Sequence, residues 1–541
     1  MWRRVGMTVR DWKRLLGVSL LLCLFSISTA FSQNGQRYLD LDSRAYTFFD
    51  AIFLEQGLAE ASTARPWSME QARHELERID TSVLSSAGTL AYEYLNSIFA
   101  YAGSMNAGFN AALNFVTSPQ GFVHANLRSD ESYEASEYTW VRGYENRNAF
   151  LEIPVDFWLD SGFYAYMNLE IKEEHATVDG GGNYFNVVLD DPYPQIDLYF
   201  PFQAYTSLGG PGWSFRFGRD RLSWGNGRTG NMLLSDYSDF YDFLGLTLFG
   251  KKATLNSVYA LLDAFDAKTL EPSVYSALMA HRLDLRLTDR LVISLNESVV
   301  FGNQEPELVR DLNYLMIFHN WMIPSRSNSL MSLEFNYTPL TDFQIYGQIA
   351  MDEFATTYEE ERSGGGGPPI FGFMLGTDGV YPMGSGYLTG GAEWAMTSPW
   401  MYSRRKAPYY YNVRRYWSLT EDAYEYIVKP IGYRYGPDAI VWNIHVGYDI
   451  PEGLELGLEG TYLIKGTTTL ATAWNPQEGD AAPSGLNPER TFTLSFDASY
   501  PVRTWIEIGL GLTFISSRDI GHIEGTYSDD LELSAYASLQ F

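Results

Sequence analysis

The sequence contains almost no cysteine and, beyond its first 30 residues, no long apolar run. Its one cysteine is Cys23, so a chain processed after residue 30 holds no thiol for disulfide or thiolate chemistry. No stretch of about 18 or more apolar residues follows Ala30, which excludes a transmembrane helix. Basic residues are also scarce, with 38 Lys and Arg against 66 Asp and Glu and a formal net charge of −28. This charge argues against a nucleic-acid partner, which requires a basic surface.

The first 30 residues have the pattern of a secretory signal peptide. An apolar run over residues 15–27 precedes a small-residue cleavage site, Ser28-Thr29-Ala30. Cleavage after Ser32 also fits. Cys23 allows a lipoprotein interpretation, but the bulky Leu22 before it disfavours lipidation. The basic residues that precede the apolar run are Arg3, Arg4, Arg10, Lys13 and Arg14. We therefore predict export from the cytoplasm.

Aromatic residues are abundant, with 38 Tyr, 32 Phe and 14 Trp. An exported chain that is rich in aromatics and lacks a membrane helix fits a transmembrane β-barrel, whose aromatic residues form girdles at the two membrane interfaces. The competing class is a large secreted β-protein.

The end of the chain, residues 531–541, alternates between two kinds of side chain. Glu532, Ser534, Tyr536, Ser538 and Gln540 fall on one face, and an apolar set falls on the other: Leu531, Leu533, Ala535, Ala537, Leu539 and Phe541. This pattern resembles the closing strand of a bacterial outer-membrane barrel, and the resemblance implies that barrel-assembly machinery recognises the strand through Phe541. The alternative is an ordinary half-buried final strand.

The same alternation recurs over most of the chain. Clear examples are residues 151–159, 163–171, 331–337, 443–449, 454–459, 492–498 and 506–514. A soluble sandwich shows this pattern too, but here it extends over about 430 residues without a break for a second domain. Membrane strands need about 9–11 residues each, so about 16 to 20 antiparallel strands fit. We predict an all-β transmembrane barrel over residues 108–541.

Residues 31–107 instead show helical spacing. Ser43 is a predicted N-cap with Gly57 as the C-terminal stop, and Ser68 with Gln71 has capping-box spacing. A third helix is predicted over about residues 83–101. We interpret residues 1–30 as the leader and 31–107 as a small periplasmic α-helical domain; the alternative is that this segment plugs or packs on the barrel mouth.

Motifs for catalysis, metals and cofactors are missing from the sequence. None of the seven histidines has H-E-x-x-H spacing, and neither a G-x-S-x-G elbow nor a P-loop occurs. Asp179, Asp190 and Asp191 flank a glycine run that is a weak candidate cation loop, although a hairpin loop explains it better. We therefore predict no enzyme activity, no metal site and no cofactor, with a barrel hydrolase as the second alternative function.

One basic patch stands out against the acidic whole. Arginines that bind carboxylates or phosphates are interleaved with tyrosines that can pack on sugar rings. The predicted glycan-binding residues are Tyr402, Arg404, Arg405, Arg414, Arg415 and Tyr416. The alternatives are a loop that contacts lipopolysaccharide phosphates and a simple solvated loop.

Residues 213–248 carry the most distinctive motif, in which G-R-x-x-x-x-W-G-x-G is followed by Leu233-Leu234-Ser235. The motif resembles the Wzi capsule-assembly family. His281-Arg282-Leu283, Ala392-Glu393-Trp394 and the G-x-x-x-G-P-D segment ending at Asp438 are similar to further blocks of that family. The resemblance implies an outer-membrane barrel of about 18 strands with a periplasmic helical bundle. It also implies a lectin-like, non-enzymatic anchor for capsular or other surface polysaccharide in contact with outer-membrane lipid and lipopolysaccharide.

The motif residues are expected to line the lumen or brace an inward loop, and ligand contact is the alternative role. They are Arg219, Arg221, Trp224, Gly225, Gly227 and Arg228. The glycines are expected to permit a tight turn or close backbone approach. The main alternative to a polysaccharide anchor is a diffusion porin with a periplasmic helical plug.

Overall fold

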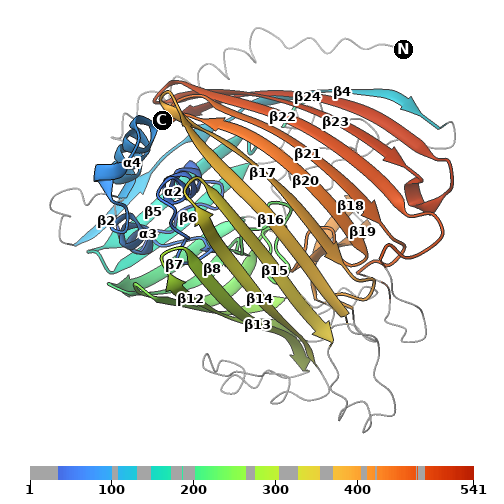
Figure 1. Ribbon diagram of the computed structural model, residues 1–541, viewed down its shortest axis with the longest axis horizontal. Helices are drawn as coiled ribbons and strands as arrows, with labels where there is room; N and C mark the ends of the chain where they lie inside the picture. The colour runs from blue at the N-terminus through green and yellow to red at the C-terminus, as the bar shows by residue number, and fades with distance from the viewer. Residues whose placement is uncertain are drawn as a thin grey trace.

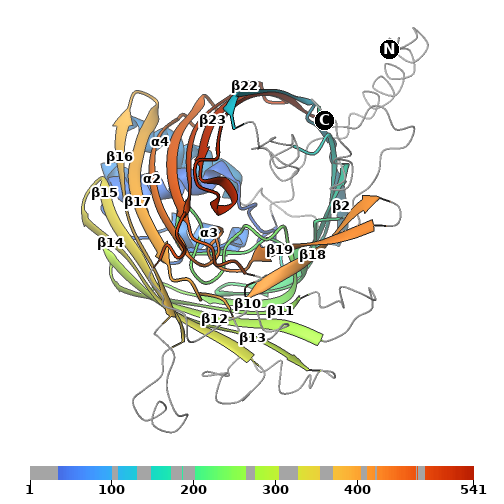
Figure 2. The same ribbon diagram turned by 90° about the vertical axis from the view of Figure 1, so that its right-hand side faces the viewer.

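The computed structural model describes twelve stretches of the chain, in which strands enclose a lumen and helices occupy one end (Figures 1 and 2). They are residues 34–99, 108–130, 148–171, 185–186, 201–262, 275–303, 327–353, 370–403, 411–420, 423–470, 472 and 482–541. The predicted signal peptide and the candidate cation loop with Asp179, Asp190 and Asp191 lie outside the described residues.

Three helices precede the first strand of the barrel: α2 (Arg44–Glu55), α3 (Met69–Leu76) and α4 (Ser86–Phe99). Ser43 caps α2, since its Oγ accepts from the backbone N–H of Ala45 at 3.3 Å, and Gly57 follows the helix with a φ of +68°. Ser68 caps α3 by accepting from the N–H of Gln71 at 3.2 Å. These caps confirm the predicted helix starts and stop. None of the described helices is both long enough and apolar enough to cross a membrane.

The helices share one aromatic core. The ring of Phe49 lies 5.5 Å from that of Trp67 and 5.6 Å from that of Phe99, measured between centroids. All three side chains are almost fully buried. Because each aromatic side chain removes a large apolar area from water, this cluster joins α2, α4 and the segment before α3 into one unit.

The described strands form a closed antiparallel barrel. Its elements are β2 (Phe109–Leu113), β3 (Val116–Thr117), β4 (Gln120–Ser129), β5 (Leu151–Leu159), β6 (Phe163–Ile171), β7 (Gln203–Gly210), β8 (Trp213–Asp220), β10 (Tyr241–Phe249), β11 (Ala253–Leu262), β12 (Tyr275–Thr288), β13 (Leu291–Asn303), β14 (Ser327–Leu340), β15 (Phe343–Glu353), β16 (Ile370–Met383), β17 (Gly386–Thr397), β20 (Ala439–Asp449), β21 (Glu455–Lys465), β22 (Glu489–Arg503), β23 (Ile506–Arg518) and β24 (Tyr527–Gln540). Since β2, β3 and β4 occupy one place between β5 and β24, the barrel has 18 strands. The predicted fold class and strand number are confirmed.

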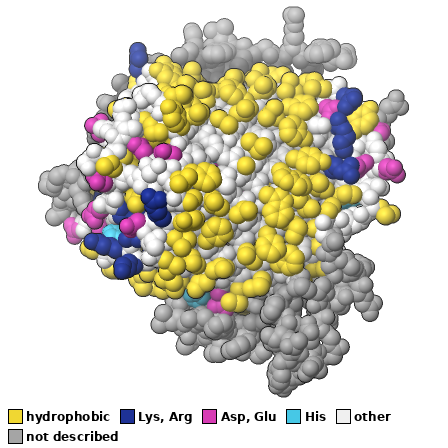
Figure 3. All heavy atoms as spheres, in the orientation of Figure 1, with side chains coloured by type: hydrophobic (Ala, Val, Ile, Leu, Met, Phe, Trp, Pro, Cys, Tyr) yellow, Lys and Arg dark blue, Asp and Glu magenta, His cyan; other side chains and the backbone are white. Residues whose placement is uncertain are grey.

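Side chains alternate across the barrel wall as the sequence predicts. On β24, Leu533 is 41% exposed on the outside while Glu532 and Ser534 are buried on the inside. On β20, Trp442 and Ile444 face outward and Asn443 faces inward, only 1% exposed. Figure 3 shows the result on one side of the molecule, a broad apolar surface with charged side chains gathered toward its ends. The closing strand is longer than predicted, because pairing with β23 starts at Tyr527.

The two ends of the barrel differ in their connections. At one end a few residues join each strand pair, such as 341–342 between β14 and β15. The helices pack on this end: the N–H of Asp342 donates to the carbonyl of Leu54 at 2.7 Å, and Arg44 Nη1 donates to the carbonyl of Gly453 at 3.2 Å. At the other end the connections are long, including 304–326 and 398–438, and the second of these contains the separate hairpin β18 (Asn412–Thr420) and β19 (Ala423–Pro430).

Candidate functional site

The luminal loop, defined as residues 221–240, joins β8 to β10 and folds back into the barrel. Its short strand β9 (Ser223–Trp224) pairs with β1 (Ala64–Arg65) of the N-terminal segment. The side chain of Trp224 is only 2% exposed, and the backbone N–H of this residue donates to the carbonyl of Leu234 at 2.9 Å. The indole is therefore part of the packed filling of the lumen.

The glycines of the motif allow the backbone of this loop to turn very tightly. Gly225 has a φ of +129°, a conformation that favours glycine. A Cβ there would lie 2.2 Å from Gln348 Nε2 and 2.3 Å from Asn231 Oδ1. At Gly227 a Cβ would lie 2.0 Å from the carbonyl oxygen of Gly230. Any side chain at these two positions therefore collides with the turn or with the barrel wall.

Glu393, on β17, holds the tip of the luminal loop. Its carboxylate is buried and accepts the backbone N–H of Arg228 at 2.7 Å and that of Thr229 at 3.0 Å. The hydroxyls of Thr229 and Tyr346 also donate to it, the latter at 2.8 Å. A buried carboxylate requires donors in place of the water it has lost, and the loop supplies most of them. Glu393 and the loop tip therefore stabilise each other.

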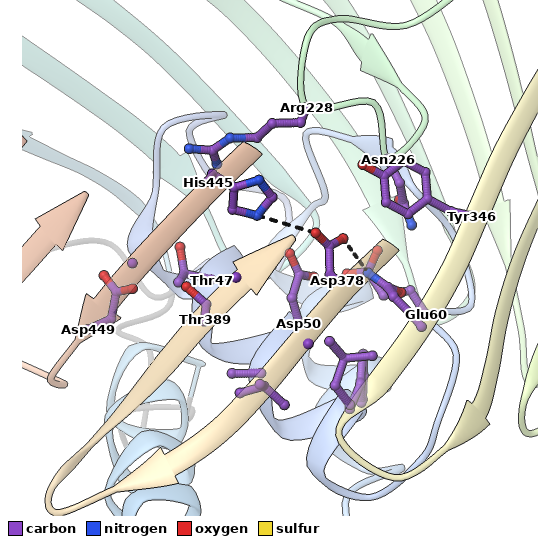
Figure 4. A pocket seen from close by; sticks show the side chains of 18 of the residues that line it. Thr47, Asp50, Glu60, Asn226, Arg228, Tyr346, Asp378, Thr389, His445 and Asp449 are labelled. Atoms are coloured by element: carbon purple, nitrogen blue, oxygen red, sulfur yellow. Dashed lines mark hydrogen bonds and ion pairs between the residues drawn. The ribbon is translucent and has the colours of Figure 1, made fainter. Parts of the chain in front are cut away.

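Arg228 extends from the loop tip into a cavity of about 410 Å³, the luminal cavity (Figure 4). Its Nη2 lies 2.8 Å from Glu459 Oε2, and 49% of its side chain is exposed. On the barrel wall, His445 Nε2 lies 3.3 Å from Asp378 Oδ1, and Figure 4 shows these two side chains facing each other. The other labelled residues are Thr47, Asp50, Glu60, Asn226, Tyr346, Thr389 and Asp449.

Carboxylates outnumber cations in the luminal cavity. Arg65 lies 2.8 Å from both Asp50 and Glu60. Burial raises the pKa of Glu60 well above its usual range, although Arg65 opposes this shift. The cavity therefore presents acceptors to hydroxyl or cationic groups and offers little to an anion.

Two further motif arginines brace the structure. Arg219 holds Asp242 with both Nε and Nη2, each at 2.8 Å, and its guanidinium lies 4.0 Å from the centre of the Phe240 ring. Arg221 pairs with Asp42 and lies 3.5 Å from Asp40 in the N-terminal segment. Burial alone would lower the pKa of Arg221, but these two carboxylates outweigh it and raise the pKa.

A second cavity, of about 490 Å³, adjoins Arg221 and is also acidic. The carboxylates that line it are Asp40, Asp42, Glu152, Glu170, Asp220, Asp239 and Glu507. Within the described ranges, no group of three or more His, Cys, Asp or Glu side chains is arranged to hold a metal ion.

The hairpin β18–β19 is rooted in the filling of the lumen. The rings of Tyr402 and Tyr411 stack with their centroids 5.7 Å apart, and both side chains are fully buried. Tyr402 Oη donates to the carbonyl of Met232 at 2.7 Å, and Tyr411 Oη donates to that of Leu233 at 2.8 Å. Lys429, at the end of the hairpin, lies 2.7 Å from Asp239. These contacts tie the base of the hairpin to the luminal loop.

The sequence profile of the capsule assembly protein Wzi matches residues 199–518, which is more than half of the chain. The chain belongs to the Wzi capsule-assembly family. The structure of Wzi from Escherichia coli, described as an outer-membrane protein involved in group 1 capsule assembly and a carbohydrate-binding β-barrel, is similar at 12% identity with a TM-score of 0.58. The match covers 93% of this chain and 99% of that protein. At this identity the likeness shows the fold, and it agrees with the barrel described above.

Two barrels of Pseudomonas aeruginosa are more distant. OccK3 (OpdO) is 11% identical with a TM-score of 0.40, over 80% of this chain and 96% of its own. OprD is 9% identical with a TM-score of 0.39, over 80% of this chain and 97% of its own. A comparison with curated protein sequences finds no match.

As a closed barrel of the Wzi family with an apolar outer wall, the protein resides in the bacterial outer membrane. Such barrels have short periplasmic turns and longer extracellular loops. The helices and the turn at 341–342 therefore lie on the periplasmic side, and the hairpin β18–β19 lies on the extracellular side.

The predicted glycan patch is divided by the structure. Tyr402 is buried at the base of the hairpin, so a glycan outside the barrel does not reach it. The sequence shows no sign of this burial, because Tyr402 is close to the arginines in the chain. Arg414, Arg415 and Tyr416 belong to β18. Arg404 and Arg405 lie outside the described residues.

The sequence did not reveal what the family's G-P-D segment does. Asp438 is fully buried and accepts the backbone N–H of Ser484 at 2.8 Å and that of Thr468 at 3.0 Å. It thus joins the start of β20 to the connection that precedes β22. The sequence shows only an aspartate after Gly-Pro. The residues that Asp438 binds are 30 and 46 positions away in sequence, so no local pattern predicts these contacts.

Proposed function

We propose that this protein binds a capsular or other surface polysaccharide and helps to attach or assemble it at the outer face of the outer membrane. The family match over residues 199–518 carries the proposal. The carbohydrate binding described for the Wzi of E. coli supports it. The packed filling of the lumen adds support, because a protein that holds a polymer at the surface has no need of an open passage.

The extracellular hairpin is the proposed contact surface for the glycan. Arg414 and Arg415 lie on β18, and Arg404 and Arg405 occur in the connection that leads to it. Guanidinium groups bind carboxylates in a paired geometry that suits uronic acids, and Tyr416 offers a ring for a sugar face. The anchoring of Tyr402 and Tyr411 in the luminal loop supports this role, because a surface that holds a polymer under load needs a firm base.

The charge of the interior favours the hairpin over the lumen for an acidic glycan. In both the luminal cavity and the second cavity, carboxylates outnumber basic side chains. Repulsion between like charges disfavours an acidic polysaccharide there. Arg228, the motif arginine that is most exposed in the luminal cavity, is already paired with Glu459.

The test is direct binding of a purified uronic-acid-containing capsular polysaccharide to the detergent-solubilised protein. The variant R404A/R405A/R414A/R415A is expected to bind at least about tenfold more weakly than wild type, because it removes all four charge-assisted contacts. The control is K251A/K252A, which removes exposed positive charge from the short turn between β10 and β11 at the other end. Equal binding by the arginine variant and wild type would remove the hairpin from the proposal, and wild type without glycan affinity would refute the function.

The same proposal includes the remaining expectations about this chain. It acts without catalysis or cofactor, residues 1–30 are removed on export, and residues 31–107 form the periplasmic domain ahead of the barrel at 108–541. The barrel-assembly machinery recognises Phe541, which is 40% exposed at the end of the closing strand.

A diffusion porin is the less favoured alternative, because the luminal loop and the N-terminal segment pack inside the barrel. A steady open conductance in planar bilayers would favour that alternative.

A further inference from the structure

Three arginines gather on the outer wall at the extracellular end of β4, β22 and β23. We call Arg128, Arg490 and Arg518 the rim cluster. Arg490 and Arg518 are directly opposite each other in the pairing of β22 with β23. Arg518 is in turn opposite Tyr527 on β24, and Arg128 is opposite Asp529 on the same strand.

The alternation along the strands places the rim cluster on the lipid-facing side. Arg518 is an even number of residues from Leu510 and Leu512, which are exposed on the outer face of β23. Arg490 is two residues before Phe492, an exposed outer residue of β22. Residues separated by an even number share a face of a strand, so Arg490 and Arg518 stand directly above the apolar belt. On β4 a register shift beside Asn126 brings Arg128 opposite Asp529, which is an even number of residues from the outward Leu533.

The rim cluster is built around one shared carboxylate and one ring. Arg128 Nη2 lies 2.7 Å from Asp529 Oδ2, and Arg518 Nη1 lies 2.7 Å from Asp529 Oδ1. The guanidinium carbons of Arg128 and Arg518 lie 5.1 and 5.7 Å from the centre of the Tyr527 ring.

The rim cluster retains donors and positive charge for a ligand. Arg490 Nη1 is 3.3 Å from Asp519 Oδ2. The three arginine side chains nevertheless remain 61%, 38% and 47% exposed for Arg128, Arg518 and Arg490 respectively. Within the described residues, three guanidinium groups thus share two carboxylates, and each guanidinium has five N–H donors.

Position in the membrane identifies the kind of ligand. Charged side chains on the lipid face are costly at mid-membrane and tolerated near the interface, and basic side chains near a membrane surface attract anionic headgroups. The rim cluster lies at the extracellular end, so it faces the headgroups of the outer leaflet. Arginine forks bind phosphate in a bidentate manner, and the adjacent Tyr527 provides an aromatic face for a sugar.

We propose that the rim cluster is a binding site for the phosphorylated sugar headgroup of a glycolipid in the outer leaflet. The site is distinct from the hairpin β18–β19, and it does not depend on the polysaccharide function. Its effect is to fix the height and rotation of the barrel against the lipid that surrounds it.

The experiment measures retention of diphosphoryl lipid A by the detergent-solubilised protein, using native mass spectrometry. The variant R128Q/R490Q/R518Q is expected to retain on the order of tenfold less diphosphoryl lipid A than wild type, because it loses the positive charge at the headgroup level. The matched control is R503Q, because Arg503 is an exposed arginine at the periplasmic end of β22. This control is expected to retain as much lipid as wild type.

Further arms separate the proposal from its rivals. Dephosphorylated lipid A of the same acyl composition is expected to bind wild type as weakly as diphosphoryl lipid A binds the glutamine variant. R128K/R490K/R518K keeps the charge but loses the bidentate fork, so intermediate retention is expected. Heat-modifiable mobility on gels verifies that each barrel is folded. Equal retention by wild type and the glutamine variant, or an equal loss in R503Q, would each overturn the proposal.

Discussion

Glu393→Ala is expected to release the luminal loop while leaving the barrel closed. The substitution removes the acceptor for the backbone N–H groups of Arg228 and Thr229 and for the hydroxyl of Tyr346. Each buried donor left without a partner costs about 1–3 kcal/mol, and such costs are not additive. Because the loop can partly relax when several donors lose their partner together, we expect the docked loop to lose about 3–5 kcal/mol of stability.

Cleavage by trypsin after Arg228 reports on this equilibrium. The backbone N–H of Arg228 is held by Glu393 in the docked loop, so cleavage requires the loop to open. A loss of about 3–5 kcal/mol corresponds to roughly a 100- to 4,000-fold increase in the open population, and the cleavage rate follows that population while reclosing is fast. Glu393→Gln keeps one acceptor oxygen, so its effect is expected to lie between those of wild type and the alanine variant.

The matched control for this measurement is Asp378→Asn. Asp378 lines the luminal cavity and lies on β16, next to the strand β17 that carries Glu393. It contacts His445 and Gln344, which belong to the barrel wall. Its replacement should leave the cleavage rate at Arg228 within about threefold of wild type, since no bond to the loop is lost. If Glu393→Ala is cleaved no faster than this control while the barrel remains heat-modifiable, the view of Glu393 as the anchor of the loop is refuted.

Three further outcomes are expected. Gly225→Ala should destabilise the docked loop by about 1–3 kcal/mol through strain and collision, visible as faster trypsin cleavage in a folded barrel; a rate equal to wild type would contradict the Cβ geometry. Glu60→Gln should stabilise the helical domain against urea at neutral pH, because burial raises the pKa of Glu60 and disfavours its charge. As pH falls the folded wild type binds the extra proton, so this advantage should vanish below about pH 4.3; an advantage that is independent of pH, or shared by the exposed Glu77→Gln, would disprove it. Deletion of Phe541 should reduce the amount of folded barrel in outer-membrane fractions, and unchanged amounts would refute recognition of that residue.

Local sequence pattern was sufficient for most of the architecture. Alternation with a period of two predicted the strands around Leu533 and Trp442. Successive side chains of a strand point to opposite faces, so a wall with lipid on one side and polar groups on the other requires apolar and polar residues to alternate. Capping at Ser43 and Ser68 predicted the helix starts, because those bonds form within three residues. The length of chain that repeats the strand pattern bounded the strand number, and the resemblance to the Wzi family narrowed it.

The contents of the lumen were decided only by the tertiary structure. Glu393 meets the luminal loop 164 residues away in sequence, and Tyr402 meets Met232 across 170 residues. No periodicity encodes such contacts, because they arise where the closed ring brings distant strands and loops to one axis. The sequence therefore placed Tyr402 in a surface patch, because arginines are its neighbours in the chain. In the folded protein Tyr402 is buried inside the barrel. The sequence was sufficient to predict the barrel wall, because one face of each strand contacts lipid and the other faces the lumen. The packing inside the lumen depended on which segments the closed barrel encloses.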